Sequence, residues 1–227
     1  MGRIRNGSVL GKMSGKIGDI VITKWMGIGV VKSTPSKNWK SKKLSEREKQ
    51  QQHLFSLVNG FLTGMDNKIL NTGYQFSGNS KMTAFNAALS YHIKHAVSGE
   101  YPDYRIEMDK VKLSRPVRST ENGWNSIMTA EKDKGLVISW ELNPFPDRNT
   151  RTDDQAVIVF YDKNREMFLL RNGIKRSLLT FTLTPLIYSA GHELYCWIFF
   201  VSADGKRVSE TEYLGRLKMP EQQISSV

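Results

Sequence analysis

The hydrophobic pattern changes its period near residue 104, and this change constrains the fold more than any other feature of the chain. Beyond that point apolar and polar residues alternate in short runs, which turn sequences such as Asp204-Gly205 separate. A period of two is typical of half-buried strands, and an Asp-Gly pair suits a tight hairpin. We therefore predict strands over residues 105–113, 136–142, 156–161, 167–170, 177–183, 193–201 and 208–214.

Seven short strands at this spacing predict an antiparallel β-sandwich. Trp140, with Ile138 and Leu142 on the same strand face, is expected to fill the space between the two sheets. The stretch over residues 195–215 resembles the last hairpin of fibronectin type III and immunoglobulin-like domains, and this resemblance would place Tyr195 at the corner-tyrosine position. It concerns the fold, and such folds host many functions.

The residues before 104 follow the period of a helix instead. Ser45 and Glu48 match a capping box, in which each side chain satisfies a free helical amide of the other residue. Gly60 and Gly64 weaken this helix by up to about 1 kcal/mol each relative to alanine, which predicts close packing or a break near them. A second helix is expected over residues 83–97. The apolar residues of the first helical stripe recur every three or four positions: Leu54, Leu57, Val58, Phe61, Leu62, Met65 and Ile69.

The N-terminal segment is strongly basic and carries a β pattern of its own. Residues 1–43 hold ten Lys or Arg against the single acid Asp19, a net charge of +9, whereas the other 184 residues hold 23 bases and 21 acids, a net charge of +2. Runs of β-branched residues over 16–25 and 28–33 predict a hairpin. A two-stranded ribbon is marginal in water, so we expect the hairpin to pack on the rest of the chain or on a partner.

Together these patterns predict an α+β protein, with a basic N-terminal β-hairpin and a helical hairpin followed by an antiparallel immunoglobulin/fibronectin-like β-sandwich. The expected parts are a basic arm with the β-hairpin over residues 1–43, a helical region over 44–103, the β-sandwich over 104–217 and a flexible tail over 218–227.

Two functions remain open for the N-terminal arm. In the first, the protein is a non-enzymatic structural subunit that self-associates or docks by strand addition through its hairpin. In the second, the basic arm binds nucleic acid, because Lys neutralises phosphates and Trp stacks on bases. The hairpin residues of the first hypothesis are Ile17, Ile20, Val21, Ile22, Trp25, Val30 and Val31. The residues that would contact phosphate or an acidic partner are Lys12, Lys16, Lys24, Lys32, Lys37, Lys40, Lys42, Lys43 and Trp39.

No catalytic, metal or cofactor site is expected from the sequence. The run from His192 to Cys196 imitates a zinc-protease motif, but it falls in a predicted strand, where residues four apart are about 13 Å apart. Cys196 itself is expected to be buried and inert. Asp153 and Asp154, beside arginines in a predicted turn, are interpreted as solvated loop charges. We therefore predict that the protein is not an enzyme.

Compartment and membrane association are predicted from what the chain lacks. No apolar stretch approaches the roughly 20 residues that cross a bilayer, and no secretory signal is visible. The single cysteine, Cys196, cannot form an internal disulfide, which favours a reducing compartment. We expect a cytoplasmic protein, or a particle assembled in the cytoplasm.

Several segments resemble a known family along nearly the whole chain. They are residues 15–25, beginning Gly-Lys-Ile-Gly, and residues 31–37, 83–88, 200–206 and 213–215. The chain resembles bacterial proteins that are catalogued only as a domain of unknown function, and this family implies no activity or catalytic residue. Its N-terminal Gly-Lys-Ile-Gly hairpin also looks like segments of phage-associated proteins, which implies a virion-like or other repetitive assembly.

Overall fold

The computed structural model describes residues 2–3, 13–25, 27–34, 43–76, 82–132, 134–184 and 190–220. Its contacts divide the chain into two compact units, Met1–Lys49 and Gln50–Val227. We call them the N-terminal unit and the body. The four-part division expected from the sequence stays a prediction.

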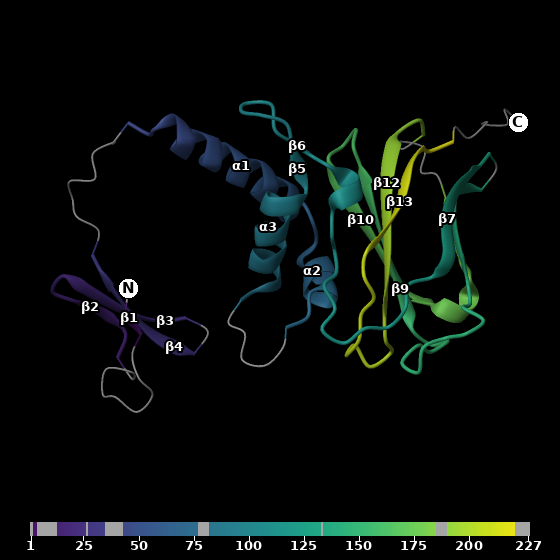
Figure 1. Ribbon diagram of the computed structural model, residues 1–227, viewed down its shortest axis with the longest axis horizontal. Helices are drawn as coiled ribbons and strands as arrows, with labels where there is room; N and C mark the ends of the chain where they lie inside the picture. Colours follow the sequence, from purple (N-terminus) through teal and green to yellow (C-terminus); the bar gives the residue numbers. More distant parts are fainter. Residues whose placement is uncertain are drawn as a thin grey trace, which may run out of the picture. The chain divides into compact units, whose positions relative to one another are not determined.

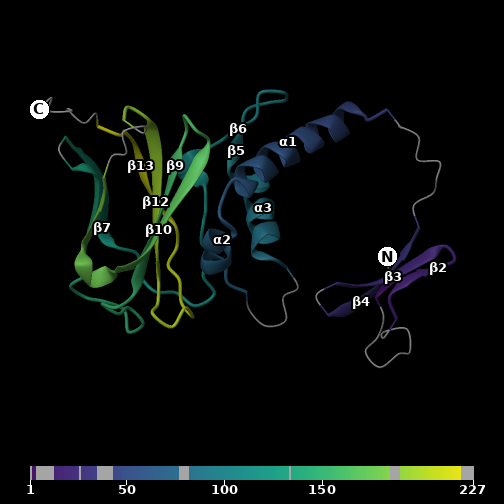
Figure 2. The same ribbon diagram turned by 180° about the vertical axis from the view of Figure 1, so that it is seen from behind.

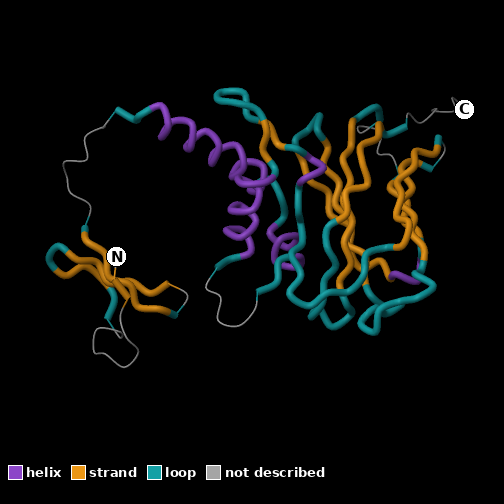
Figure 3. The backbone as a smooth tube through the Cα atoms, in the orientation of Figure 1, coloured by secondary structure: helices purple, strands orange, loops and turns teal. Residues whose placement is uncertain are grey.

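The N-terminal unit contains a four-stranded antiparallel sheet rather than an isolated hairpin. Its strands are β1 (Gly2–Arg3), β2 (Gly15–Ile17), β3 (Ile20–Trp25) and β4 (Ile28–Ser33), in the spatial order β1-β4-β3-β2. Figure 3 draws the strands in orange. Gly18 and Gly27 take positive φ angles of 57° and 77° in the turns on either side of β3, a conformation that glycine adopts without steric cost. The predicted hairpin is therefore β3 and β4, and it has two further strands beside it.

Helix α1 (Glu46–Thr63) begins at the predicted capping box. The Ser45 amide donates to Glu48 Oε2 at 2.8 Å, and the Glu48 amide donates to Ser45 Oγ at 3.3 Å. The helix ends immediately before Gly64, so the break expected near the glycines is confirmed.

Two further helices follow, and each has a side-chain cap at its start. They are α2 (Asn67–Gly73) and α3 (Ala84–His95). Asp66 accepts the amide of Lys68 at 2.8 Å before α2, and Thr83 accepts the amide of Asn86 at 3.1 Å before α3. The helix predicted over residues 83–97 is thus present as α3.

The remainder of the body is antiparallel sheet, so the protein is an α+β protein. Strands β10 (Met167–Lys175), β9 (Gln155–Asp162), β12 (Glu193–Val201) and β13 (Glu212–Lys218) form one sheet in that order. Strands β11 (Thr180–Leu183), β8 (Gly135–Glu141) and β7 (Trp124–Glu131) form a second. A small pair, β5 (Val97–Ser98) and β6 (Arg105–Ile106), follows α3.

Strand β12 lies between two hydrophobic clusters, because its alternate side chains enter different cores. Tyr195, Trp197 and Phe199 pack in a cluster with helical residues such as Leu62 and Ile69. The opposite side chains of β12 pack in a second cluster that also contains Ile138, Trp140 and Leu183 of the three-stranded sheet: Leu194, Cys196, Ile198 and Phe200. Helices α2 and α3 and strand β7 accordingly lie on opposite sides of the four-stranded sheet (Figures 1 and 2).

Some local predictions are wrong. The strand expected over residues 105–113 is only the two residues of β6, which a short 3-10 helix at Met108–Lys110 follows. Strand β7 was not expected. Trp140 and Ile138 are buried as predicted, but Leu142 lies beyond the end of β8 and is exposed. Tyr195 packs in the helical cluster, and its hydroxyl donates to Glu193 Oε2 at 3.3 Å rather than to a backbone carbonyl.

No helix in the described parts of the chain is long and apolar enough to cross a membrane.

Candidate functional site

The register of the N-terminal sheet assigns its residues to two different faces. Directly paired residues of antiparallel strands share a face, and alternate residues of one strand point to opposite faces. Ile17 pairs with Ile20, and Ile22 pairs with Val31. We call these four side chains the aliphatic face: Ile17, Ile20, Ile22 and Val31. Lys24 belongs to the same face, two residues beyond Ile22.

The opposite face combines lysines with a tryptophan. Val21 pairs with Lys16 on one side and with Lys32 on the other, so both ammonium groups lie on this face. Trp25 and Val30 share the face by alternation. We call it the basic face: Lys16, Val21, Thr23, Trp25, Val30 and Lys32. A cavity of about 270 Å³ is lined by Thr23, Lys24, Trp25, Val30 and Lys32.

The sheet buries few of its apolar side chains. Among the described residues of the N-terminal unit, Ile22 and Val30 are the buried apolar side chains. Val21 and Val31 are half-buried. Ile17 is 53% exposed and Ile20 is 40% exposed, and Trp25 is exposed on the other face. Water-exposed isoleucines at neighbouring positions make an apolar surface that association could bury.

One of the two exposed isoleucines, Ile17, lies in the edge strand β2, and Ile20 is its paired neighbour in β3. β2 is the outermost strand, and within the described residues it pairs with β3 alone. The outer side of such a strand presents unpaired backbone groups, which can pair with another strand.

The structure places some of the predicted partner-contact residues and not others. Lys16, Lys24, Lys32 and Lys43 are exposed. Lys12, Lys37, Trp39, Lys40 and Lys42 lie outside the described residues.

Two side chains of the body with the chemistry for catalysis or metal binding, His92 and Cys196, are buried. His92 is buried: its Nδ1–H donates to the Ala88 carbonyl oxygen at 2.7 Å, and its Nε2 accepts the Lys112 amide at 3.3 Å. Burial lowers the pKa of His92 and raises the pKa of the Cys196 thiol. Within the described ranges, no three His, Cys, Asp or Glu side chains are grouped so as to hold a metal ion.

The interpretation of Asp154 as a solvated loop charge is wrong. The side chain of Asp154 is fully buried, and its Oδ2 lies 3.6 Å from Nη2 of the buried Arg176. Oδ2 also accepts the Thr120 hydroxyl at 2.7 Å. Asp153 is exposed, as expected. Adjacent aspartates have the same local signature in the sequence, so only the fold distinguishes them.

Sequence reasoning also missed a cavity of about 510 Å³ in the body, beside the C-terminal half of α1. Gly60 and Gly64 line it. Their positions inside a predicted helix were the one available sign of this site.

These features define an α+β protein with an N-terminal antiparallel sheet and a body that contains helices, a four-stranded sheet and a three-stranded sheet. The chain belongs to a family of unknown function, DUF6266, whose profile matches residues 12–215. This confirms the resemblance noted from the sequence.

Other comparisons add little. No curated protein matches the chain. A solved structure described as "Myokine structure" is 18% identical, with a TM-score of 0.34, over 45% of this chain and 100% of that chain. A likeness of this size supports no inference about fold or function.

Proposed function

We propose that the protein is a non-enzymatic assembly subunit that associates with further copies of itself through the N-terminal sheet. The observation that carries the proposal is the pair of exposed isoleucines, Ile17 and Ile20, on the aliphatic face at the β2 edge. Copies joined in this way would build a repetitive particle, of which a phage-virion-like assembly is one form. Assembly in the cytoplasm stays a prediction.

Strand addition at β2 accounts for both the backbone and the side chains of this edge. A second copy that pairs along β2 satisfies its outer amides and carbonyls and extends the sheet. The added strand lies beside Ile17 of β2, and packing of the aliphatic faces of the two copies covers Ile20 of β3. Burying an aliphatic side chain of this size contributes about 1.5–3 kcal/mol, so the pair can decide whether two copies associate.

The distribution of lysines is compatible with such a contact. Lys16 and Lys32 are on the basic face, so joining aliphatic faces does not bring them together. Lys24 lies beyond Ile22 toward the end of β3 and away from the Ile17–Ile20 pair. Salt at physiological strength screens the remaining repulsion beyond about 8 Å.

We further propose that the four-stranded and three-stranded sheets of the body form an immunoglobulin/fibronectin-like β-sandwich that the assembly displays outward. The strand orders β7-β8-β11 and β10-β9-β12-β13 support this, because a fibronectin-like domain pairs its first, second and fifth strands in one sheet. The shared cluster around Trp140 and Phe200, whose ring centroids are 5.6 Å apart, also supports it.

The burial of the reactive groups supports a non-enzymatic role. Cys196 is inaccessible, and its raised pKa disfavours the nucleophilic thiolate. Both ring nitrogens of His92 are engaged by the backbone, so it is poorly placed to transfer protons.

The test is size-exclusion chromatography with light scattering, at low and at high salt, with absorbance recorded at protein and nucleic-acid wavelengths. We expect a large, nucleic-acid-free particle that persists in high salt. Ile17→Lys and Ile20→Lys should each raise the dissociation constant at least about tenfold, since about 1.4 kcal/mol is tenfold. Thr23→Lys adds the same charge to the basic face and should leave association unchanged. A wild-type monomer at both salt concentrations contradicts the proposal.

The basic face supports a second candidate function, the binding of nucleic acid. Lys16 and Lys32 lie beside Val21 on the face that also exposes Trp25, and this combination suits phosphate neutralisation and base stacking. Lys16→Gln with Lys32→Gln should then weaken binding of a single-stranded oligonucleotide and reduce its salt dependence by about 0.7 in log–log slope per lost phosphate contact. Neutralising Lys40, Lys42 and Lys43 should have the same effect. A monomer whose nucleic acid is removed by salt would favour this function over assembly.

A further inference from the structure

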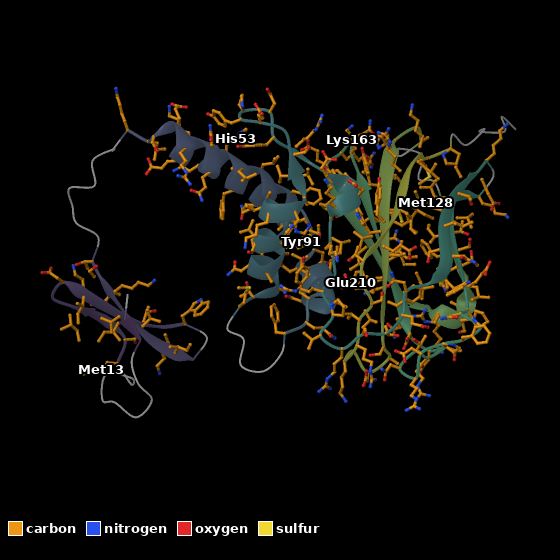
Figure 4. All side chains as sticks on the ribbon, viewed as in Figure 1. Met13, His53, Tyr91, Met128, Lys163 and Glu210 are labelled. Carbon is orange, nitrogen blue, oxygen red and sulfur yellow. The ribbon has the colours of Figure 1, made fainter. Side chains whose placement is uncertain are left out.

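The cavity beside α1 lies wholly within the body. Its volume of about 510 Å³ falls in the range of small-molecule sites. One side is lined by α1 and the residue after it, namely Leu57, Gly60, Phe61 and Gly64. Another side is lined by residues 104–106 and Met108. The remainder comes from β9, β10, the turn between them and Tyr195 of β12. Figure 4 labels Lys163 in that turn.

Gly60 of α1 and Gly64, the residue after the helix, make no close contact within the chain that would require a glycine. A Cβ atom added at Gly60 meets nothing within 4 Å, and one at Gly64 makes ordinary contacts, of which Phe168 Cε2 at 3.8 Å is one. Gly60, inside the helix, nevertheless costs up to about 1 kcal/mol of helix stability relative to alanine. Gly73 is the contrasting case, because an added Cβ there would lie 2.0 Å from the Leu113 carbonyl oxygen. Gly60 therefore leaves open a space at the cavity that a larger side chain would occupy.

Aromatic rings form the apolar wall of the cavity. Phe61 meets Tyr161 and Phe168 edge to face, with ring centroids 5.6 Å and 5.2 Å apart, and Tyr161 and Phe168 are 4.7 Å apart. All three rings are only partly buried. A flat aromatic ligand can join such a group by stacking or edge contacts.

Two cations line the cavity together with these rings. The Arg105 Nε bonds to Ser98 Oγ at 3.3 Å and lies 3.7 Å from Glu107 Oε1, while Nη1 and Nη2 make no bond to any described residue. Lys163 Nζ lies 3.5 Å from Glu193, which Arg216 also neutralises at 3.4 Å. Both pairs are long and their basic members are exposed, and such pairs contribute little, so an anionic ligand can replace them. Glu166 is the lining acid that opposes these two bases.

We propose that this cavity binds a small aromatic anion. The ring packs against Phe61, Tyr161 and Phe168, and a carboxylate or sulfonate bonds to Arg105 and Lys163. A planar anion suits the terminal nitrogens of Arg105, which can donate two parallel hydrogen bonds. The proposal is independent of assembly through the N-terminal sheet.

The test uses the full chain and the fluorescent aromatic sulfonate 8-anilinonaphthalene-1-sulfonate, with the uncharged N-phenyl-1-naphthylamine as a comparison. Gly60→Leu fills the cavity and should abolish saturable binding of both probes. Arg105→Gln with Lys163→Gln should weaken binding of the sulfonate about tenfold or more, and leave binding of the uncharged probe within about twofold. Circular dichroism and denaturant unfolding establish that each variant is folded.

A matched control removes a charge from another cavity. Arg171 lines the cavity between β10 and β11, so Arg171→Gln should leave both affinities unchanged. The proposal is overturned if folded Gly60→Leu binds the sulfonate as the wild type does. It is also overturned if Arg171→Gln, and not the Arg105/Lys163 pair, weakens binding, or if the wild-type protein binds neither probe saturably.

Discussion

The buried pair of Asp154 and Arg176 gives a quantitative test of the fold. Asp154 is 0% exposed and Arg176 is 3% exposed. Besides its contact with Asp154, the guanidinium donates to the carbonyl oxygens of Glu121 and Asn122 at 2.5 Å and 2.9 Å. It also lies 4.0 Å from the ring centroid of Phe200. The pair thus joins segments that are far apart in the sequence.

Replacing Asp154 with alanine removes the nearest countercharge of a buried cation and leaves the carboxylate of Glu121 as the other acidic group acting on it. Breaking a buried ion pair in this way costs about 3–5 kcal/mol. The two carbonyl oxygens and the Phe200 ring continue to stabilise the guanidinium, so we expect the lower part of that range, about 3 kcal/mol. This is a large share of the roughly 5–15 kcal/mol by which a domain is stable. Arg176→Met in the same chain removes the uncompensated cation, so the double variant should be more stable than Asp154→Ala alone.

The assay is denaturant unfolding followed by the fluorescence of the buried Trp140 and Trp197. Asp153→Ala is the matched control, because Asp153 is exposed and its loss should change the free energy of unfolding by at most about 0.5 kcal/mol. A loss below about 1 kcal/mol in Asp154→Ala would refute the argument. So would a double variant that loses the full sum of the two single changes, because the pair would then have no coupling.

Three further predictions use residues of the body. Gly73→Ala should lower the free energy of unfolding by at least about 2 kcal/mol, because the added methyl group clashes with Leu113. Gly60→Ala should instead raise the free energy of unfolding by up to about 1 kcal/mol. Thermal unfolding of both variants checks these two predictions, and equal effects of the two substitutions would contradict them. Burial lowers the pKa of His92, so as the pH falls the imidazole is protonated in the unfolded chain before it is protonated in the folded chain. The free energy of unfolding should therefore be highest above about pH 6.5, and below that pH it should fall by up to about 1.4 kcal/mol per pH unit. Unfolding measured between pH 5 and 8 should show this slope in the wild type and lose it in His92→Gln. Cys196 should react with a thiol reagent only at the rate of unfolding, and rapid labelling of the native protein would contradict its burial.

Local patterns succeeded where neighbouring residues determine the structure. The capping box at Ser45 and Glu48 and the predicted strand over residues 193–201 both appear at the expected positions. Strand β7 was missed because none of its side chains is fully buried, so it has no strong apolar alternation. Residues 105–113 were misassigned for the opposite reason. Their apolar residues pack into the helical core from a 3-10 helix and irregular backbone, which imitates the alternation of a strand.

The sequence by itself determined the α+β composition, the starts of α1 and α3, most strands, the basic N-terminal segment and the family, whereas α2 was not predicted as a separate helix. These depend on propensities and periodicities that act over a few residues. The tertiary structure alone decided that Asp154 is buried and Asp153 is not, and that Lys16 and Lys32 share a face opposite Ile17 and Ile20. It alone placed Gly60 at a cavity with Arg105 and Lys163. Each of these depends on contacts between residues distant in the chain, and strand register and packing, rather than local pattern, bring such residues together.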